Sequence, residues 1–241
     1  MKQILLLQSR PEDDVAENEC ESICRLGRID PARIVRLRME RDELTEIDLD
    51  TYAAIIVGGG PANFASPDDQ KSDGQKRYEA WLIALVQRVI AMDKPFLGMC
   101  LGIGVVAMAL GERPSFNYGE SVEPTEIVVD ELTIDDPILV GLPVRFYALV
   151  GHKEGINEAP IGSEELARSS TCVQMLKCGK NVYATQFHPE LDVPGLAIRV
   201  EAYKHHGYFP PEEGDEIVAN ATKADISHAV KVLQNFVKRY T

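Results

Sequence analysis

Short apolar segments alternate with amphipathic helical segments through the first hundred residues, and this alternation constrains the fold more than any other feature of the chain. Strands are expected over residues 4–7, 34–39, 53–57 and 96–99, with 34–39 on the outside of the sheet and 53–57 near its centre. Helices are expected over 16–27, capped by Gly27, over 78–89 and over 101–110. Because strands joined through helices run parallel, the sequence predicts an α/β fold: a mostly parallel open sheet with helices on both faces.

In the second half of the chain, the predicted strands are joined by very short connections instead of by helices. Residues 170–171 and 178–180 are hairpin-sized links, so this part is predicted to be an antiparallel strand extension of the sheet. Two more helices are expected, one after Asp192 and one from about Asp225, after an acidic loop. The predicted strands are Glu126–Val129, Arg145–Val150, Leu166–Ser169, Cys172–Leu176 and Asn181–Phe187.

Length and charge limit the remaining possibilities. With 241 residues, the chain is expected to form a single domain over 1–241, of which about 206–241 is a C-terminal helical extension. Its formal net charge of −13 repels phosphate backbones and anionic lipids, so we expect neither nucleic acid nor a membrane as a partner. The N-terminus reads as a buried strand and not as a signal peptide, and no apolar run is long enough to span a bilayer. A cytoplasmic location is therefore expected.

Cysteine and histidine pairs give no pattern typical of a metal site. Cys20 and Cys24 lie four residues apart on one face of a predicted helix, but no further ligand lies near them in sequence, so they are predicted to be buried core residues. His205 and His206 are adjacent, and adjacent helical side chains point apart. No metal and no cofactor are expected, and the five cysteines are expected to be reduced.

Residues 98–102, Gly-Met-Cys-Leu-Gly, follow a predicted strand and begin a predicted helix. A G-x-C-x-G sequence in this position is typical of a nucleophile elbow, in which the central side chain sits on a strained turn and the glycines permit close backbone approach. The positive end of a helix also favours the thiolate form of a cysteine. The alternative interpretation is that Cys100 is a small buried residue.

Two further segments favour the catalytic interpretation. The loop Gly58-Gly59-Gly60-Pro61 follows a central strand and can direct a backbone N–H toward an oxyanion. The segment 186–190, Gln-Phe-His-Pro-Glu, ends a predicted strand and places His188 and Glu190 on either side of a rigid proline. A cysteine nucleophile needs a base and a group that orients the base, and these two residues are of the required types.

These three motifs, in this order, resemble those of the class I glutamine amidotransferases, and most closely the stand-alone proteins that are similar to the GMP synthase glutaminase domain. The resemblance runs from residue 1 to about 205 and implies a flavodoxin-like sheet. It implies that Cys100 is the nucleophile, His188 the general base and acid, and Glu190 the residue that orients His188. It further implies an oxyanion hole at Gly60 and Leu101 and substrate binding at Gly59, Gly104, Val150, Gly151 and His152, with His152 structural and not catalytic.

One departure from the family bears on the substrate. The family usually has a glutamine four residues after the nucleophile, whereas this chain has Gly104, which is expected to leave room there. Three functions therefore stay open: a glutaminase that delivers ammonia to a separate synthetase partner or acceptor, a γ-glutamyl peptidase-like hydrolase with the same triad, and a non-catalytic regulatory or metabolite-binding subunit. The expected ligand is a small molecule, glutamine or a γ-glutamyl compound, and the oligomeric state stays open.

Overall fold

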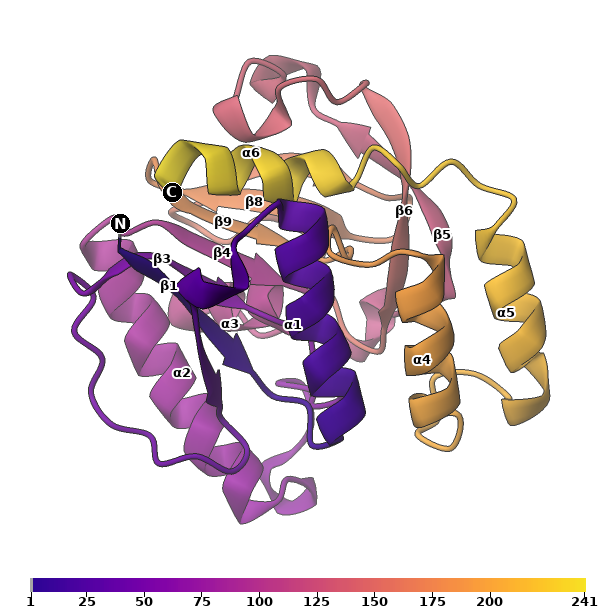
Figure 1. Cartoon of the computed structure of the whole chain (residues 1–241), viewed down its shortest axis with the longest axis horizontal. Helices are drawn as coiled ribbons and strands as arrows, with labels where there is room; N and C mark the ends of the chain where they lie inside the picture. Colours follow the sequence, from indigo (N-terminus) through magenta and orange to yellow (C-terminus); the bar gives the residue numbers. More distant parts are fainter. Residues whose placement is uncertain (1) are drawn as a thin grey trace.

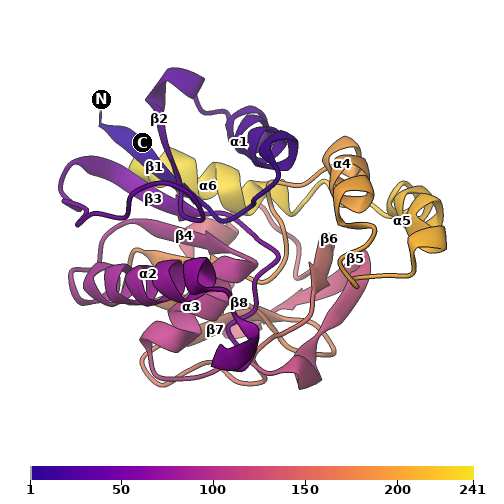
Figure 2. The ribbon, with the colours of Figure 1, turned by 90° about the horizontal axis from the view of Figure 1, so that it is seen from below.

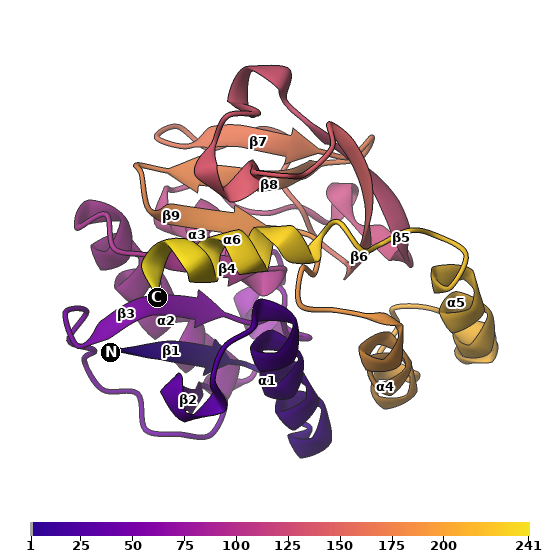
Figure 3. The same cartoon turned by 45° about the horizontal axis from the view of Figure 1, so that its top comes forward.

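A computed structural model describes residues 2–241 and shows one nine-stranded sheet in the order β2-β1-β3-β4-β9-β8-β7-β5-β6 (Figure 3). The strands are β1 Gln3–Gln8, β2 Ile34–Arg38, β3 Tyr52–Val57, β4 Phe96–Met99, β5 Glu120–Val129, β6 Arg145–His152, β7 Glu164–Arg168, β8 Val173–Cys178 and β9 Val182–Thr185. The helices are α1 Asp13–Gly27, α2 Asp73–Ala91, α3 Leu101–Ala109, α4 Val193–Tyr203, α5 Gly214–Ala221 and α6 Val230–Tyr240 (Figure 1).

The sheet has a parallel half and an antiparallel half, as the sequence predicts. Strands β2, β1, β3, β4 and β9 pair in parallel, with β2 at the edge. From β9 onward the neighbours β8, β7, β5 and β6 pair antiparallel. The two predicted short connections join β7 to β8 and β8 to β9, so both hairpins are confirmed.

Helices cover both faces of the parallel half because successive side chains of each strand point in opposite directions. In β1, Ile4 and Leu6 pack in one core cluster with residues of α1 and α6, whereas Leu5 and Leu7 pack in the other with residues of α2 and α3. Figure 2 shows α1 and α6 on one side of these strands and α2 and α3 on the other. A strand buried on both faces must be apolar throughout, which explains the uninterrupted run at 4–7.

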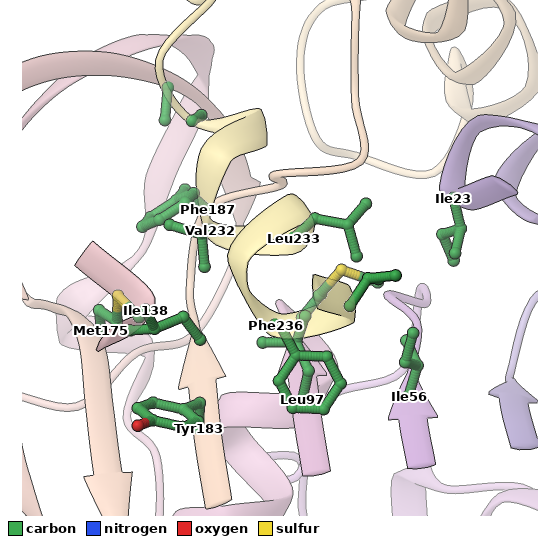
Figure 4. Packing of buried hydrophobic residues seen from close by; sticks show 14 of the residues in the cluster. Ile23, Ile56, Leu97, Ile138, Met175, Tyr183, Phe187, Val232, Leu233 and Phe236 are labelled. Carbon is green, nitrogen blue, oxygen red and sulfur yellow. The ribbon is translucent and has the colours of Figure 1, made fainter. Parts of the chain in front are cut away.

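The C-terminal helix α6 is part of the main core. Leu233 and Phe236 are fully buried over Leu97 and Ile56 of the sheet (Figure 4). Burying one such side chain contributes about 1.5–3 kcal/mol. Helix α6 therefore covers a face of the sheet that would otherwise be open between α1 and the hairpins.

Several predicted boundaries are wrong. Gly27 is the last residue of α1 and not its cap; Arg28, with φ 58°, takes the left-handed cap position. A methyl group on Gly27 would lie 3.2 Å from Cγ of Leu233, so Gly27 serves the packing of α1 against α6. Helix α6 begins at Val230 instead of about Asp225, and the predicted acidic loop contains α5.

Strand β5 also begins earlier than predicted, at Glu120 instead of Glu126. Pro124 lies in this additional part, opposite Leu149 of β6. On its other side β5 pairs with β7 only at Val128 and Val129, so Pro124 lies where β5 has a single partner. Proline has no backbone N–H to donate to a neighbouring strand, so it is tolerated at such an open edge of the sheet.

None of the helices within residues 2–241 combines the length and the apolar composition that a bilayer-spanning segment requires.

Close packing between β4 and α3 explains one of the two glycines in the 98–102 motif. A methyl group on Gly98 would lie 2.8 Å from backbone atoms of Gly102, a separation that side chains do not tolerate. A methyl group on Gly102 would lie 3.5 Å from the carbonyl oxygen of Val57, which is ordinary contact. Only Gly98 is therefore required for the turn from β4 into α3.

We expect Gly98→Ala to lower the free energy of unfolding by about 2 kcal/mol or more, because α3 must move away from β4 to admit the methyl group. Gly102→Ala, the matched control, should change it by less than about 1 kcal/mol, since alanine also favours the helix. Urea unfolding of both variants measures the difference. Equal destabilisation by the two substitutions would contradict this explanation of the motif.

Candidate active site

The three predicted motifs meet at one edge of the sheet because they follow neighbouring parallel strands. Val57 of β3 is paired with Gly98 of β4, and Met99 of β4 with Thr185 of β9. The N–H of Cys100 donates to the carbonyl oxygen of Thr185 at 2.8 Å, which extends the β4–β9 ladder by one residue. Ligands of open α/β sheets bind at the carboxyl ends of strands, and this edge is that end.

Cys100 has an unusual backbone and an accessible thiol. Its φ of 54° and ψ of −92° lie in a region that residues with a Cβ rarely adopt, and α3 begins at the next residue. The other four cysteines are buried, whereas Cys100 is half-buried. Gln186 directs its Nε2 to within 4.0 Å of the Cys100 sulfur. The backbone strain and the exposure together set this thiol apart from the rest.

His188 and Glu190 form a buried pair beside Cys100. Nδ1 of His188 donates to Oε1 of Glu190 at 2.8 Å, and Arg199 of α4 donates to the same oxygen at 3.1 Å. Burial alone would lower the pKa of His188, but the negative charges of Glu190 and Cys100 raise it to about 9. Burial alone would raise the pKa of Glu190, yet His188 and Arg199 hold it far below its usual range. The carboxylate therefore stays charged, and its attraction favours the protonated imidazole.

Gly59 lies where the side chains of Arg10, His188 and Cys100 come together. A methyl group on Gly59 would lie 2.7 Å from Nη2 of Arg10, 2.9 Å from Cε1 of His188 and 3.5 Å from Cβ of Cys100. The N–H of Gly59 donates to Oε1 of Glu19 at 3.2 Å, which fixes the glycine loop to α1. Because Gly59 has no side chain, the space beside Arg10, His188 and Cys100 stays free.

Cys100 lies between two cavities. The first, which we call the α3 cavity, is lined by Leu101 and Gly104 of α3, together with His152, Glu154 and Gln186. The second, which we call the α4 cavity, is lined by Leu196, Arg199 and Val200 of α4, together with His188, Val150 and Gly151. Cys100, Gly60 and Tyr208 line both cavities.

Gly104 lines the α3 cavity and also lies against the ring of Phe64. A methyl group on Gly104 would lie 3.0 Å from Cδ2 of Phe64. Phe64 is held in place by Glu154, whose carboxylate accepts the N–H groups of Phe64 at 2.9 Å and of Ala65 at 2.6 Å. Burial raises the pKa of Glu154. Gly104 itself lines the α3 cavity, and the fully buried ring of Phe64 packs behind it.

The side chain of His152 is engaged in a hydrogen-bond network. Nδ1 donates to the carbonyl oxygen of Glu154, and Nε2 lies 2.8 Å from Oε2 of Glu120. Glu120, His152 and Cys172 bring metal-ligand atoms within 4.8 Å of one another, but the Cys172 sulfur, at 3.6 Å from Glu120, and the imidazole both already contact the Glu120 carboxylate. This contact network favours a structural role for His152, whose side chain holds the end of β6 against the α3 cavity.

The sequence did not identify Arg10, Glu19 or Arg199 as residues near the site. Arg10 follows β1 and pairs with Glu19 of α1 at 2.7 Å, with both side chains buried. Arg199 lies in an otherwise apolar stretch of α4 and pairs with Glu190. An isolated charge in an apolar helical segment is the one signal that could have pointed to Arg199.

Comparison with known families identifies the family of this chain. Residues 13–194 match the family model described as glutamine amidotransferase class-I. The chain belongs to the class I glutamine amidotransferases. Members of this family are enzymes, so the arrangement at the carboxyl ends of β3, β4 and β9 lies in a catalytic domain.

Curated relatives of this amidotransferase are GMP synthases. A subunit of the glutamine-hydrolysing GMP synthase of Ignicoccus hospitalis is 34% identical over 146 residues, which cover 58% of this chain and 68% of that protein. The GMP synthase of Thermomicrobium roseum is 31% identical over 167 residues, which cover 66% of this chain but only 29% of that protein. The match therefore takes in less than a third of the longer enzyme.

Solved structures share the fold of this amidotransferase. A glutamine amidotransferase of Thermotoga maritima superimposes with a TM-score of 0.77 at 18% identity, with 100% of this chain and 98% of that chain covered. One from Methylobacillus flagellatus gives a TM-score of 0.74 at 16% identity, with 100% and 94% covered. The fold is thus shared over the whole described chain, including α5 and α6.

We expect Cys100→Gly to be more stable than Cys100→Ala by about 1 kcal/mol, because only glycine adopts the backbone angles of this residue without strain. Both variants lack the thiol, so the comparison isolates the backbone. Thermal or urea unfolding of the two proteins measures the difference. An alanine variant at least as stable as the glycine variant would show that the turn at Cys100 is not strained.

The raised pKa of His188 predicts a dependence of stability on pH. A pKa of about 9 in the folded protein exceeds the ordinary value of 6.5, so the stabilisation is fully present below pH 6.5 and is lost as the pH rises through about 9. The difference in unfolding free energy between the wild type and His188→Gln should therefore shrink between pH 6.5 and pH 9. Urea unfolding across this range measures it, and a constant or growing difference would contradict the assignment.

Proposed function

We propose that this chain hydrolyses the side-chain amide of glutamine through a γ-glutamyl thioester on Cys100. The Cys100 sulfur attacks the amide carbon after His188 accepts the proton of the thiol. The N–H groups of Gly60 and Leu101 stabilise the negative charge that develops on the carbonyl oxygen. The C–N bond then breaks as His188 protonates the leaving nitrogen, and ammonia departs. Water hydrolyses the thioester, which yields glutamate and restores the thiol.

The observation that carries this proposal is the hydrogen bond between His188 and Glu190 next to a half-buried thiol on a strained turn. A carboxylate that accepts from Nδ1 leaves Nε2 of the imidazole as the atom that exchanges a proton with the nucleophile. Arg199 and His188 together keep Glu190 ionised, as its lowered pKa indicates. These groups are the parts that amide hydrolysis by a cysteine requires.

The glutamate part of the substrate fits the α3 cavity. This cavity contains Leu101, one of the two proposed oxyanion donors, so the carbonyl must lie at its mouth. Lys153 and Glu154 give it one basic and one acidic side chain. They are complementary to the α-carboxylate and the α-ammonium group of a γ-glutamyl substrate.

The partner of this chain follows by analogy with its GMP synthase relatives. The Ignicoccus hospitalis protein is named as one subunit of a glutamine-hydrolysing synthase. We propose that this chain likewise delivers ammonia to a separate synthetase.

The proposal predicts that the purified protein releases ammonia and glutamate from glutamine. Cys100→Ser should lower kcat by about a thousandfold or more, since a serine hydroxyl is a far weaker nucleophile than a thiolate. Cys20→Ser, a change of the same kind at a buried cysteine of α1, should retain activity. Acid quenching followed by mass spectrometry should detect the γ-glutamyl adduct on the peptide that contains Cys100.

The result that would overturn the proposal is a folded wild-type protein that forms no adduct and releases no ammonia. Equal activity of the wild type and Cys100→Ser would also overturn the proposal. Retained binding of glutamine without turnover would instead favour a metabolite-binding role.

A further inference from the structure

The turn that follows α4, residues 204–209, brings Tyr208 beside Cys100. Tyr208 lines both cavities that contain Cys100, and it also lines an open groove between β5 and α5, which we call the β5 groove. Other walls of this groove are Pro124, Tyr147 and Ile217. Among residues 2–241, Tyr208 alone lines all three hollows. Its side chain is therefore a wall that the two cavities and the groove share.

The side chain of Tyr208 lies close enough to the Cys100 sulfur to be affected by its charge. Burial is the main reason why the pKa of Tyr208 is well above its ordinary value, and the negative charge of Cys100 raises it further. The hydroxyl group therefore stays protonated. A neutral aromatic side chain in this position acts on the site mainly through its size.

Lys153, which directly follows β6, holds this ring in place. Its Nζ lies 4.5 Å from the centre of the Tyr208 ring and donates to the carbonyl oxygen of His206 at 2.6 Å. The chain turns at Gly207, whose φ of 71° is one that residues with a Cβ rarely adopt. A cation over an aromatic face contributes about 0.5–2 kcal/mol. One ammonium group thus fastens both the ring and the turn that carries it.

Tyr208 is also the one residue at the junction of the two cavities that can exclude larger molecules. Cys100, Gly60 and Tyr208 are the three residues that both cavities share. Gly60 has no side chain, and Cys100 carries the reacting group itself. A tyrosine has only two side-chain torsions, so its ring keeps its position once it is held.

We infer that Tyr208 is a specificity-determining residue, whose ring limits the size of the molecules that reach the Cys100 sulfur. Lys153 and the turn at residues 204–209 hold the ring in that position. The consequence for the substrate rests on the proposed function. The unsubstituted amide of glutamine passes the ring, whereas an amide with a bulky group on its nitrogen is excluded.

Two neutral thiol reagents with the same reactive group and different sizes test this inference: iodoacetamide and N-(1-pyrenyl)iodoacetamide. The rate at Cys100 is followed by mass spectrometry of the peptide that contains it. In Tyr208→Ala we expect the ratio of the pyrenyl rate to the iodoacetamide rate to rise at least tenfold above that of the wild type. Tyr208→Phe, which keeps the ring, should leave the ratio unchanged. Lys153→Met keeps the ring but loses both contacts of Nζ, so its ratio should rise less than that of Tyr208→Ala.

The substrate ratio is the second measurement. We expect kcat/KM for γ-glutamyl-p-nitroanilide, divided by kcat/KM for glutamine, to rise at least tenfold in Tyr208→Ala and to stay unchanged in Tyr208→Phe. The control Phe116→Ala removes a ring that is 51% exposed and lies outside all three hollows. It should change neither ratio.

Either ratio staying at the wild-type value in a folded Tyr208→Ala protein overturns this inference. Equal rises in Tyr208→Phe and Tyr208→Ala overturn it too, because the hydroxyl group and not the ring would then be responsible. A wild-type protein that does not hydrolyse glutamine overturns the proposed function, and the alkylation ratio alone then decides this inference.

Discussion

The parallel pairing of β4 with β9 is the constraint on which the site depends. It places Cys100 directly after one strand and Gln186 directly after its neighbour, so two segments that are distant in sequence end side by side. The pairing is buried on both faces, and any shift in register would disrupt the close packing of the β4 side chains on each face. The relative positions of Cys100 and of the segment that leads to His188 are therefore fixed by the same packing that stabilises the fold.

The C-terminal part of the chain contributes to this rigidity. Leu233 and Phe236 of α6 cover the face of the sheet on which α1 packs, and α1 in turn supplies Glu19, which holds the N–H of Gly59. We therefore propose that the chain forms one domain, in which α6 supports the glycine loop through α1. The glycine loop follows β3, but contacts from α1 hold it in position.

The sequence predicts the sheet and the three motifs well, because apolar periodicity and a strand-to-helix glycine motif are local patterns. It predicts much less about what surrounds them. The ring of Phe64 at Gly104 and the contact of Gly27 with Leu233 depend on which distant segments meet. Arg10 and Arg199 line the same cavity as Cys100 only because folding brings distant segments together. Local patterns thus point to the candidate nucleophile, whereas the residues that would select a substrate depend on non-local packing.

The charge distribution explains why such selection must act at short range. With a net charge of −13 the molecule repels anions as a whole, and at physiological ionic strength this repulsion is screened beyond about 8 Å. Inside the site, each buried arginine already faces one buried carboxylate, Arg10 with Glu19 and Arg199 with Glu190. An anionic ligand is therefore not drawn in by an excess of positive charge. Selection of an anionic group there would depend on individual hydrogen-bond donors at short range.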